Sequence, residues 1–215
     1  GSYAKTSPYY LQALYTEGYI RMQLEDYDDA YDAFAKFAQQ AKDVEPRQMQ
    51  DVYNRMGDCK YVGKAFNDAI SNYNYVINAK GKDADYATYQ KALCYGALGK
   101  YPEKLNNLNY IFEKFNNSQY ASKATFEIGK TYLLCDNTDM SLLYYRNFIN
   151  QYPDNSQVKS ALLDMGLIYY NTGRNADALR TFDRLLTDYA GTDEARDALN
   201  TVKNIYISEN RVDED

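Results

Sequence analysis

Apolar and polar residues alternate along most of the chain with the period of an α-helix. Between residues 161 and 169, for example, apolar residues recur at spacings that place them on one helix face, as in Ala161, Leu162, Met165, Ile168 and Tyr169. The breaks between such segments fall at Asn, Asp and Gly residues, as at 116–118, 154–156 and 191–193. Proline occurs only four times, so long helices are permitted almost everywhere. The pattern predicts helices over 8–23, 27–42, 47–62, 66–79, 84–98, 101–115, 119–134, 138–151, 156–172, 175–189 and 193–208.

The same arrangement of small and large residues recurs five times along the chain. Each unit contains a small residue in its first helix, and these lie 39, 35, 37 and 37 positions apart at Gly18, Gly57, Ala92, Gly129 and Gly166. Twelve positions later three units have Ala, at Ala30, Ala69 and Ala178, and sixteen positions later all have a large apolar residue, at Phe34, Tyr73, Leu108, Tyr145 and Phe182. A small residue lets one helix approach the next closely, and the large one fills the space beside it. The repeat predicts an all-α fold of five stacked helical hairpins, with the helix over 193–208 as a cap.

The third unit departs from this pattern. It has Ala92 in place of glycine and Lys104 in place of alanine, and Gly96 and Gly99 lie near the end of its first helix. A glycine inside a helix costs about 1 kcal/mol relative to alanine. We therefore expect the third hairpin to be the least regular, with a possible bend there.

The repeat resembles the tetratricopeptide repeat (TPR). The fourth unit has Gly129, Tyr132, Tyr145, Phe148 and Pro153, with Ser141 in place of the alanine; the fifth has Gly166, Tyr169, Ala178 and Phe182. The first two units have Arg21 and Lys60 where the family usually has an aromatic residue. The segments 148–156 and 176–179 are similar to cell-envelope members of the family, such as the outer-membrane-assembly lipoprotein, the Tol–Pal coordinator and large envelope proteins of Bacteroidetes.

This resemblance implies a right-handed α-solenoid that forms one domain over residues 8–208. Its repeats would cover about 8–45, 47–81, 84–117, 119–154 and 156–190, followed by the cap over 193–208. Residues 1–7 and 209–215 would be the flexible ends of a fragment. The envelope relatives imply a periplasmic or outer-membrane-associated location, and the cytoplasm stays open as the alternative.

In this family the first helices line a concave groove that binds partners. Counted from each small residue, the groove would hold Tyr15, Tyr19, Asn54, Arg55, Asp58, Tyr61, Tyr86, Tyr89, Lys123, Phe126, Lys130, Leu163, Leu167 and Tyr170. Aromatic side chains interleaved with a few charges are typical of recognition surfaces. We therefore predict a scaffold that binds a peptide or a partner segment, with Arg55, Asp58, Lys123 and Lys130 setting its orientation. The alternatives are a glycan or cell-wall module that uses the same tyrosines, and self-association through this face.

Catalytic chemistry has little support in the sequence. Histidine is absent, which removes the commonest general base and metal ligand. Cys59, Cys94 and Cys135 are interpreted as core thiols rather than a disulfide, redox or metal set, and the acidic run 25–29 as a turn and helix start rather than a calcium loop. We predict no enzyme activity, cofactor or metal. A net charge of −6 disfavours nucleic acid as a partner, and the apolar runs are too short to insert in a membrane.

Overall fold

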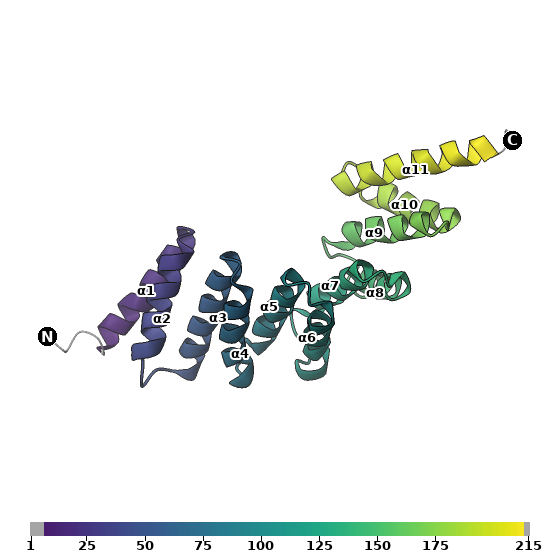
Figure 1. Cartoon of the computed structure of the whole chain (residues 1–215). Helices are drawn as coiled ribbons and strands as arrows, with labels where there is room; N and C mark the ends of the chain where they lie inside the picture. The colour runs from purple at the N-terminus through teal and green to yellow at the C-terminus, as the bar shows by residue number, and fades with distance from the viewer. Residues whose placement is uncertain (1–6, 213–215) are drawn as a thin grey trace. The chain divides into compact units, whose positions relative to one another are not determined.

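The computed structural model describes residues 7–212, and this part of the chain is entirely helical (Figure 1). The helices are α1 (Pro8–Gln23), α2 (Tyr27–Gln40), α3 (Pro46–Val62), α4 (Phe66–Asn78), α5 (Ala84–Ala97), α6 (Tyr101–Lys114), α7 (Ala121–Leu134), α8 (Thr138–Gln151), α9 (Val158–Asn171), α10 (Asn175–Asp188) and α11 (Asp193–Val212). The prediction of an all-α fold built from helical hairpins is confirmed. Of the ends predicted to be flexible, 209–212 lie in α11, and 1–6 and 213–215 lie outside the described residues.

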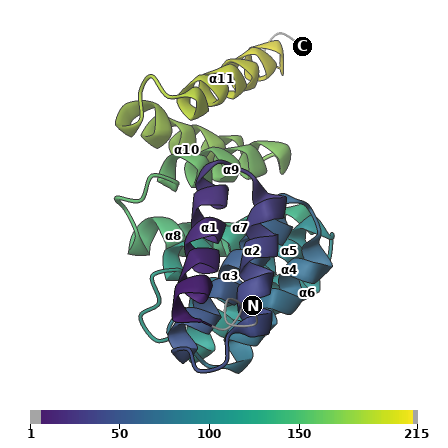
Figure 2. The same ribbon diagram turned by 90° about the vertical axis from the view of Figure 1, so that its left-hand side faces the viewer.

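The chain divides into two compact units, residues 1–121 and residues 122–215. Within the first, α1 packs on α2, α3 on α4 and α5 on α6, and α2 and α4 each pack on the first helix of the next hairpin. Figure 2 shows α1 and α2 side by side, joined by a short turn. In the second unit α9 packs on α8, α10 and α11. The single continuous domain over 8–208, with its repeat bounds, stays a prediction.

Each hairpin turn contains one residue in the left-handed conformation, seven positions after the small residue. The φ angles lie between 56° and 73° at these five residues: Glu25, Lys64, Gly99, Asp136 and Gly173. The next amide donates back across the helix end, as from Ala65 N to Lys60 O at 2.9 Å and from Arg174 N to Tyr169 O at 2.8 Å. This bond pairs a carbonyl that the helix end leaves open, so the turn ends the first helix at the same place in every hairpin.

Replacing Lys64 by glycine is expected to raise the free energy of unfolding by about 0.5 kcal/mol. A side chain is strained at the φ of 60° found here, whereas glycine adopts this conformation freely, and its greater freedom in the unfolded chain offsets part of the gain. Chemical denaturation measures the change. As a control, Ala79→Gly, at a φ of −71°, should lower stability by about 0.5–1 kcal/mol.

In four of the five hairpins, a glycine lies directly against the large ring of the second helix. A Cβ atom added at Gly18 would be 2.5 Å from Phe34 Cζ, and one added at Gly57 would be 2.5 Å from Tyr73 Cε1. The pairs Gly129–Tyr145 and Gly166–Phe182 repeat the contact in the second unit, with closest approaches of 3.0 Å and 2.2 Å. The small residue therefore makes room for a flat ring, and the four glycine hairpins share one packing rule.

The third hairpin lacks both the glycine and the ring, and its being the least regular stays a prediction. Its second helix carries Leu108, fully buried, where the others carry an aromatic ring, and Ala92 replaces the glycine. Gly96 leaves space for the stem of buried Lys104, whose Cδ would be 2.9 Å from an added Cβ. Gly99 is the left-handed turn residue and lies outside α5, so it does not weaken that helix.

The interpretation as core thiols is confirmed for Cys59 and Cys94 and is wrong for Cys135. Cys59 and Cys94 are buried and Cys135 is exposed, and all three are free. Burial raises the pKa of the Cys59 and Cys94 thiols to about 12. Among residues 7–212, no cluster of three or more acidic or cysteine side chains could hold a metal ion, and no helix is long and apolar enough to cross a membrane.

Candidate partner-binding surface

In the first unit the first helices place tyrosines around two aspartates of α3. The hydroxyl groups of Tyr15 and Tyr19, one helical turn apart on α1, both donate to Asp51 Oδ2, the first at 2.7 Å. Their rings lie edge to face with centroids 5.1 Å apart, and both also contact the buried Phe34. Asp51 thus ties the first hairpin to the second through two phenols.

Asp58, two helical turns further along α3, joins the second hairpin to the third. Its Oδ1 accepts hydrogen bonds from Tyr73 of α4 and Tyr86 of α5, each at 2.7 Å. Arg55 lies between the two aspartates, with Nη1 2.9 Å from Asp58 Oδ2 and Nε 3.6 Å from Asp51 Oδ1. Its guanidinium also lies over the Tyr86 ring, 5.3 Å from the centroid. We call Tyr15, Tyr19, Asp51, Arg55, Asp58, Tyr73 and Tyr86 the tyrosine–aspartate network.

Burial controls the protonation of this network. It raises the pKa of Tyr73, Tyr86 and Tyr19 above the usual tyrosine range, and hydrogen bonds to a carboxylate add to the effect. Burial also raises the pKa of Asp58, against the opposing effects of Arg55 and the two phenols. The three phenols stay protonated and direct their protons at aspartates. Tyr19 and Tyr86 are half-buried and can offer a partner their rings, but no further hydrogen to donate, whereas Tyr73 is fully buried.

More aromatic rings continue this face beyond Tyr86. Tyr120, just before α7, lies edge to face with Tyr86 at 5.7 Å and stacks on Tyr89 at 5.5 Å. Ser118 of the same segment donates to Asp85 at the start of α5, at 2.6 Å. The first unit therefore carries half-buried tyrosine rings on α1, on α5 and just before α7. Hydrogen bonds to the aspartates of α3 fix Tyr15, Tyr19 and Tyr86.

The predicted groove residues of the first unit separate into two groups. Tyr15, Tyr19, Arg55, Asp58, Tyr86 and Tyr89 lie together in or beside the network. Asn54 is 1 % exposed, with a buried Oδ1 that has no hydrogen-bond partner, so it cannot contact another molecule in this conformation. Tyr61, half-buried, packs on Phe66 of its own hairpin with the ring centroids 5.5 Å apart.

The predicted residues of the second unit form a more apolar group. Leu163, Leu167 and Tyr170 are half-buried on α9 and pack against the core, whereas Lys123 and Lys130 of α7 are exposed. Phe126 is only 5 % exposed and packs on Tyr145 and Phe148, so its predicted contact with a partner is wrong for this conformation. The hydroxyl of Tyr145 donates to Asp164 at 2.6 Å. One groove that joins the residues of both units stays a prediction.

The sequence reasoning missed three contributors to the network and its surroundings: Asp51, Tyr73 and Tyr120. Asp51, Arg55 and Asp58 are spaced i, i+4 and i+7, which places them on one face of α3, and this spacing could have revealed the network. Tyr73 was interpreted as core, and its ring is fully buried, but its hydroxyl reaches the aspartate.

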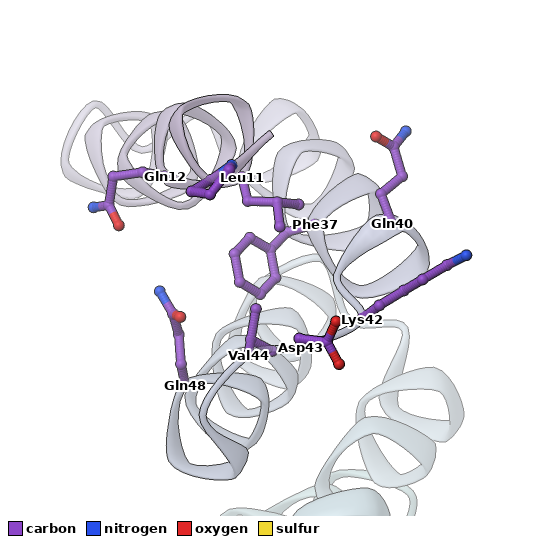
Figure 3. Close-up of a pocket in the computed structure, with 9 residues that line it drawn as sticks. Leu11, Gln12, Phe37, Gln40, Lys42, Asp43, Val44 and Gln48 are labelled. Carbon is purple, nitrogen blue, oxygen red and sulfur yellow. The ribbon is translucent and has the colours of Figure 1, made fainter. Parts of the chain in front are cut away.

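A cavity of about 410 Å³ lies elsewhere in the first unit, where the first hairpin meets the second (Figure 3). It is lined by α1, the end of α2, the linker before α3 and the start of α3. Figure 3 shows the Phe37 ring at its centre and the amides of Gln12 and Gln48 on one side. These two hairpins have the longest repeat spacing, 39 residues, and the extra linker residues form one wall.

Comparison with known proteins agrees with the fold. The sequence model described as "Tetratricopeptide repeat" matches residues 160–192, which cover most of α9, all of α10 and the turn that follows. A TPR repeat-containing protein from Methanocaldococcus jannaschii is 24% identical over 200 residues, covering 87% of this chain and 34% of the relative. The chain therefore spans about a third of the length of that relative.

Several solved structures share this fold, although their sequences differ greatly from that of this chain. The type IV pilus biogenesis factor PilW has a TM-score of 0.70 at 15% identity, with coverage of 91% of this chain and 85% of PilW. YrrB, described as a TPR protein with an unusual peptide-binding site, has 0.63 at 16%, covering 85% and 88%. A tetratricopeptide repeat protein from Parabacteroides merdae has 0.66 at 16%, covering 95% and 75%.

The recurring small and large residues, the five hairpins, the repeat match and the shared fold agree with one another. Residues 160–192 match the tetratricopeptide-repeat model, and the chain has the fold of tetratricopeptide-repeat proteins.

Proposed function

We propose that this chain holds a partner protein by an extended segment that lies across α1, α3 and α5 of the first unit. The TPR fold supports a protein-interaction scaffold. The observation that carries the finer proposal is the tyrosine–aspartate network, which fixes several half-exposed rings before a partner arrives. Rings that are already ordered lose little conformational entropy on binding, so their burial contributes more to affinity.

The chemistry of this face favours a partner segment with basic and aromatic side chains. Two aspartates and one arginine leave an excess of negative charge, and the side chain of Asp51 is 27% exposed. A lysine or arginine of the partner can approach that carboxylate and lie against the neighbouring tyrosine rings. The phenols of the network have no hydrogen left to donate to a sugar oxygen, because each is already donated to a carboxylate. We therefore favour a protein ligand over a glycan.

Selection of a random peptide library on the full chain tests this proposal. Selected peptides should be enriched in lysine, arginine and aromatic residues, and Tyr89→Ala should weaken their binding at least tenfold, as measured by calorimetry. Tyr110→Ala is the matched control, because Tyr110 is 36% exposed on the second helix α6 and should leave binding unchanged. Cell-wall oligosaccharides form a second arm. Binding of these sugars, with no peptide selected, would support the glycan alternative and refute the peptide proposal.

We also propose that the protein works in the bacterial envelope, in the periplasm or at the outer membrane. The resemblance of residues 148–156 to envelope TPR proteins supports this location. Fractionation of cells that express the natural full-length protein tests it, and recovery in the cytoplasmic fraction would refute it.

A further inference from the structure

The first helix exposes an apolar stripe on its outer side. Tyr9, Ile20 and Leu24 are 89%, 50% and 69% exposed, and Ala13 lies between them on the same face. Together with Glu17 they line a long shallow hollow along α1. Isolated exposed apolar residues are normal on a protein surface, but a contiguous stripe along a whole helix marks a contact surface.

In the later hairpins, the residues at the same repeat positions are covered by other parts of the chain. Ala13, Glu17 and Ile20 correspond by repeat position to Val52, Met56 and Cys59 in α3, and to Ala161, Met165 and Ile168 in α9. All six of these residues are buried, and the second helix of the preceding hairpin packs on α3 and on α9. In α5 the equivalent residues are Ala87 and Cys94, fully buried, and the half-buried Lys91. The α1 stripe is therefore the one of these four surfaces that another helix does not cover within the described residues.

The last helix, α11, exposes the side that in α9 packs on the second helix of the same hairpin. Leu199 and Tyr206 of α11 correspond to Leu162 and Tyr169 of α9, which are 2% and 7% exposed because α9 packs on α10, the second helix of its hairpin. In α11 the same positions are 42% and 53% exposed. A cavity of about 240 Å³ lies beside Leu199, between the end of α10 and the start of α11. The described chain has no helix after α11 to cover this surface.

Opposite charges occupy the centres of the two stripes. Glu17 stands where α3 and α9 have methionine, and Lys203 stands where α9 has the small Gly166. In α1, Glu17 lies four positions after Ala13 and three before Ile20. In α11, Lys203 lies four positions after Leu199 and three before Tyr206. The two stripes thus match in spacing and are complementary in charge.

We propose that α11 of one copy of this chain docks on α1 of a second copy, with Lys203 opposite Glu17. The contact covers both stripes at once. A symmetric contact would place Glu17 against Glu17 or Lys203 against Lys203, and like charges disfavour both arrangements. Each copy presents one stripe of each kind, so the contact between two copies is head-to-tail. It does not involve the tyrosine–aspartate network, so it is independent of peptide binding.

Sedimentation of the 215-residue chain over a range of concentrations tests the proposal. The mean mass of the wild type should rise with concentration above that of the monomer. Ile20→Asp on α1 and Tyr206→Asp on α11 should each weaken association at least 30-fold, because each places a charge in an apolar contact. Phe112→Asp is the control: this residue is 46% exposed on α6, outside both stripes, and its replacement should change nothing. Circular dichroism verifies that every variant is folded.

Mixing the two variants distinguishes a head-to-tail contact from a symmetric one. The Ile20→Asp variant keeps an intact α11 stripe, and the Tyr206→Asp variant keeps an intact α1 stripe. An equal mixture of the two should therefore form dimers and no larger species. Glu17→Lys and Lys203→Glu should each weaken association about tenfold, and the two changes combined in one chain should restore it.

Three results would overturn the proposal. The wild type could remain monomeric at every concentration. Tyr206→Asp could associate as strongly as the wild type, or the mixture of variants could remain monomeric.

Discussion

Gly18→Ala is expected to lower the free energy of unfolding of the first unit by about 2 kcal/mol. An added Cβ would lie 2.5–2.8 Å from three atoms of the Phe34 ring, and that ring is fully buried between α1 and α2. The ring has no space to move into, so overpacking costs about 3 kcal/mol, of which the better helix propensity of alanine returns about 1 kcal/mol. Urea denaturation followed by circular dichroism measures the change.

Two further variants show whether the cost comes from the ring. Gly63→Ala is the matched control in the same unit, because its Cβ would meet nothing closer than 3.5 Å, at Cys59 O. It should leave stability unchanged or slightly higher. In the double variant Gly18→Ala/Phe34→Leu, the pair becomes the Ala92–Leu108 pair of the third hairpin, and the two effects should be less than additive by about 1–2 kcal/mol. Additive effects would show that Gly18 matters for another reason.

The hairpin fold was predictable because the small and large residues obey a local steric rule. A glycine facing a ring recurs at a fixed separation of sixteen residues, so the alignment of five short segments reveals it. The third hairpin shows the limit of that reasoning. Lys104 looks like a defect in the sequence, but Gly96 leaves room for its stem, and only the packed helices bring these two residues together.

The turn conformations were harder to predict from the sequence. Gly99 and Gly173 are typical residues for a left-handed turn, whereas Glu25 and Lys64 hold the same conformation although their side chains disfavour it. The carbonyl bonds that close the helix ends keep them there. Only the comparison of all five hairpins shows that one backbone requirement applies at this position.

The candidate site was predicted in part. Helical spacing from the small residue correctly gathered Tyr15, Tyr19 and Tyr86 on one face, but the sequence did not show that Asp51 and Asp58 bond their hydroxyls. These bonds join residues 28 to 36 positions apart, so they depend on how one hairpin stacks on the next. Arg55 and Asp58, expected to orient a partner, pair with each other, and that expected role stays a prediction.

Asp58→Ala is expected to lower the free energy of unfolding of the first unit by about 3–4 kcal/mol. The change leaves the hydroxyl of Tyr73, a fully buried residue, and that of Tyr86 without the acceptor they share. Arg55, whose side chain is 25% exposed, keeps only its longer contact with Asp51. Breaking a partly buried charge network by removing one member costs more than the network contributes as a whole. Urea denaturation measures the loss.

Tyr73→Phe tests the same network from the donor side. It should cost only about 1 kcal/mol, because Asp58 keeps Tyr86 and Arg55 as partners. The double variant Asp58→Ala/Tyr73→Phe should be no less stable than Asp58→Ala alone, since the buried hydroxyl that lost its acceptor is then absent. A double variant less stable than Asp58→Ala by the full cost of Tyr73→Phe would show that the two residues act independently.

The pH dependence of stability gives the clearest signature of the buried phenol. Burial beside Asp58 raises the pKa of Tyr73 above its value of 10.0 in the unfolded chain, so its contribution is complete below about pH 10 and is lost as the pH rises further. Above that pH each such tyrosine lowers the free energy of unfolding by about 1.4 kcal/mol per pH unit, because only the unfolded state releases the proton. Tyr73→Phe should therefore make the alkaline slope shallower by that amount, measured by urea titrations between pH 9 and pH 11.

Tyr110→Phe, on the exposed side of α6, should leave the slope unchanged. An unchanged slope in Tyr73→Phe would mean that the phenol ionises equally easily in the folded protein.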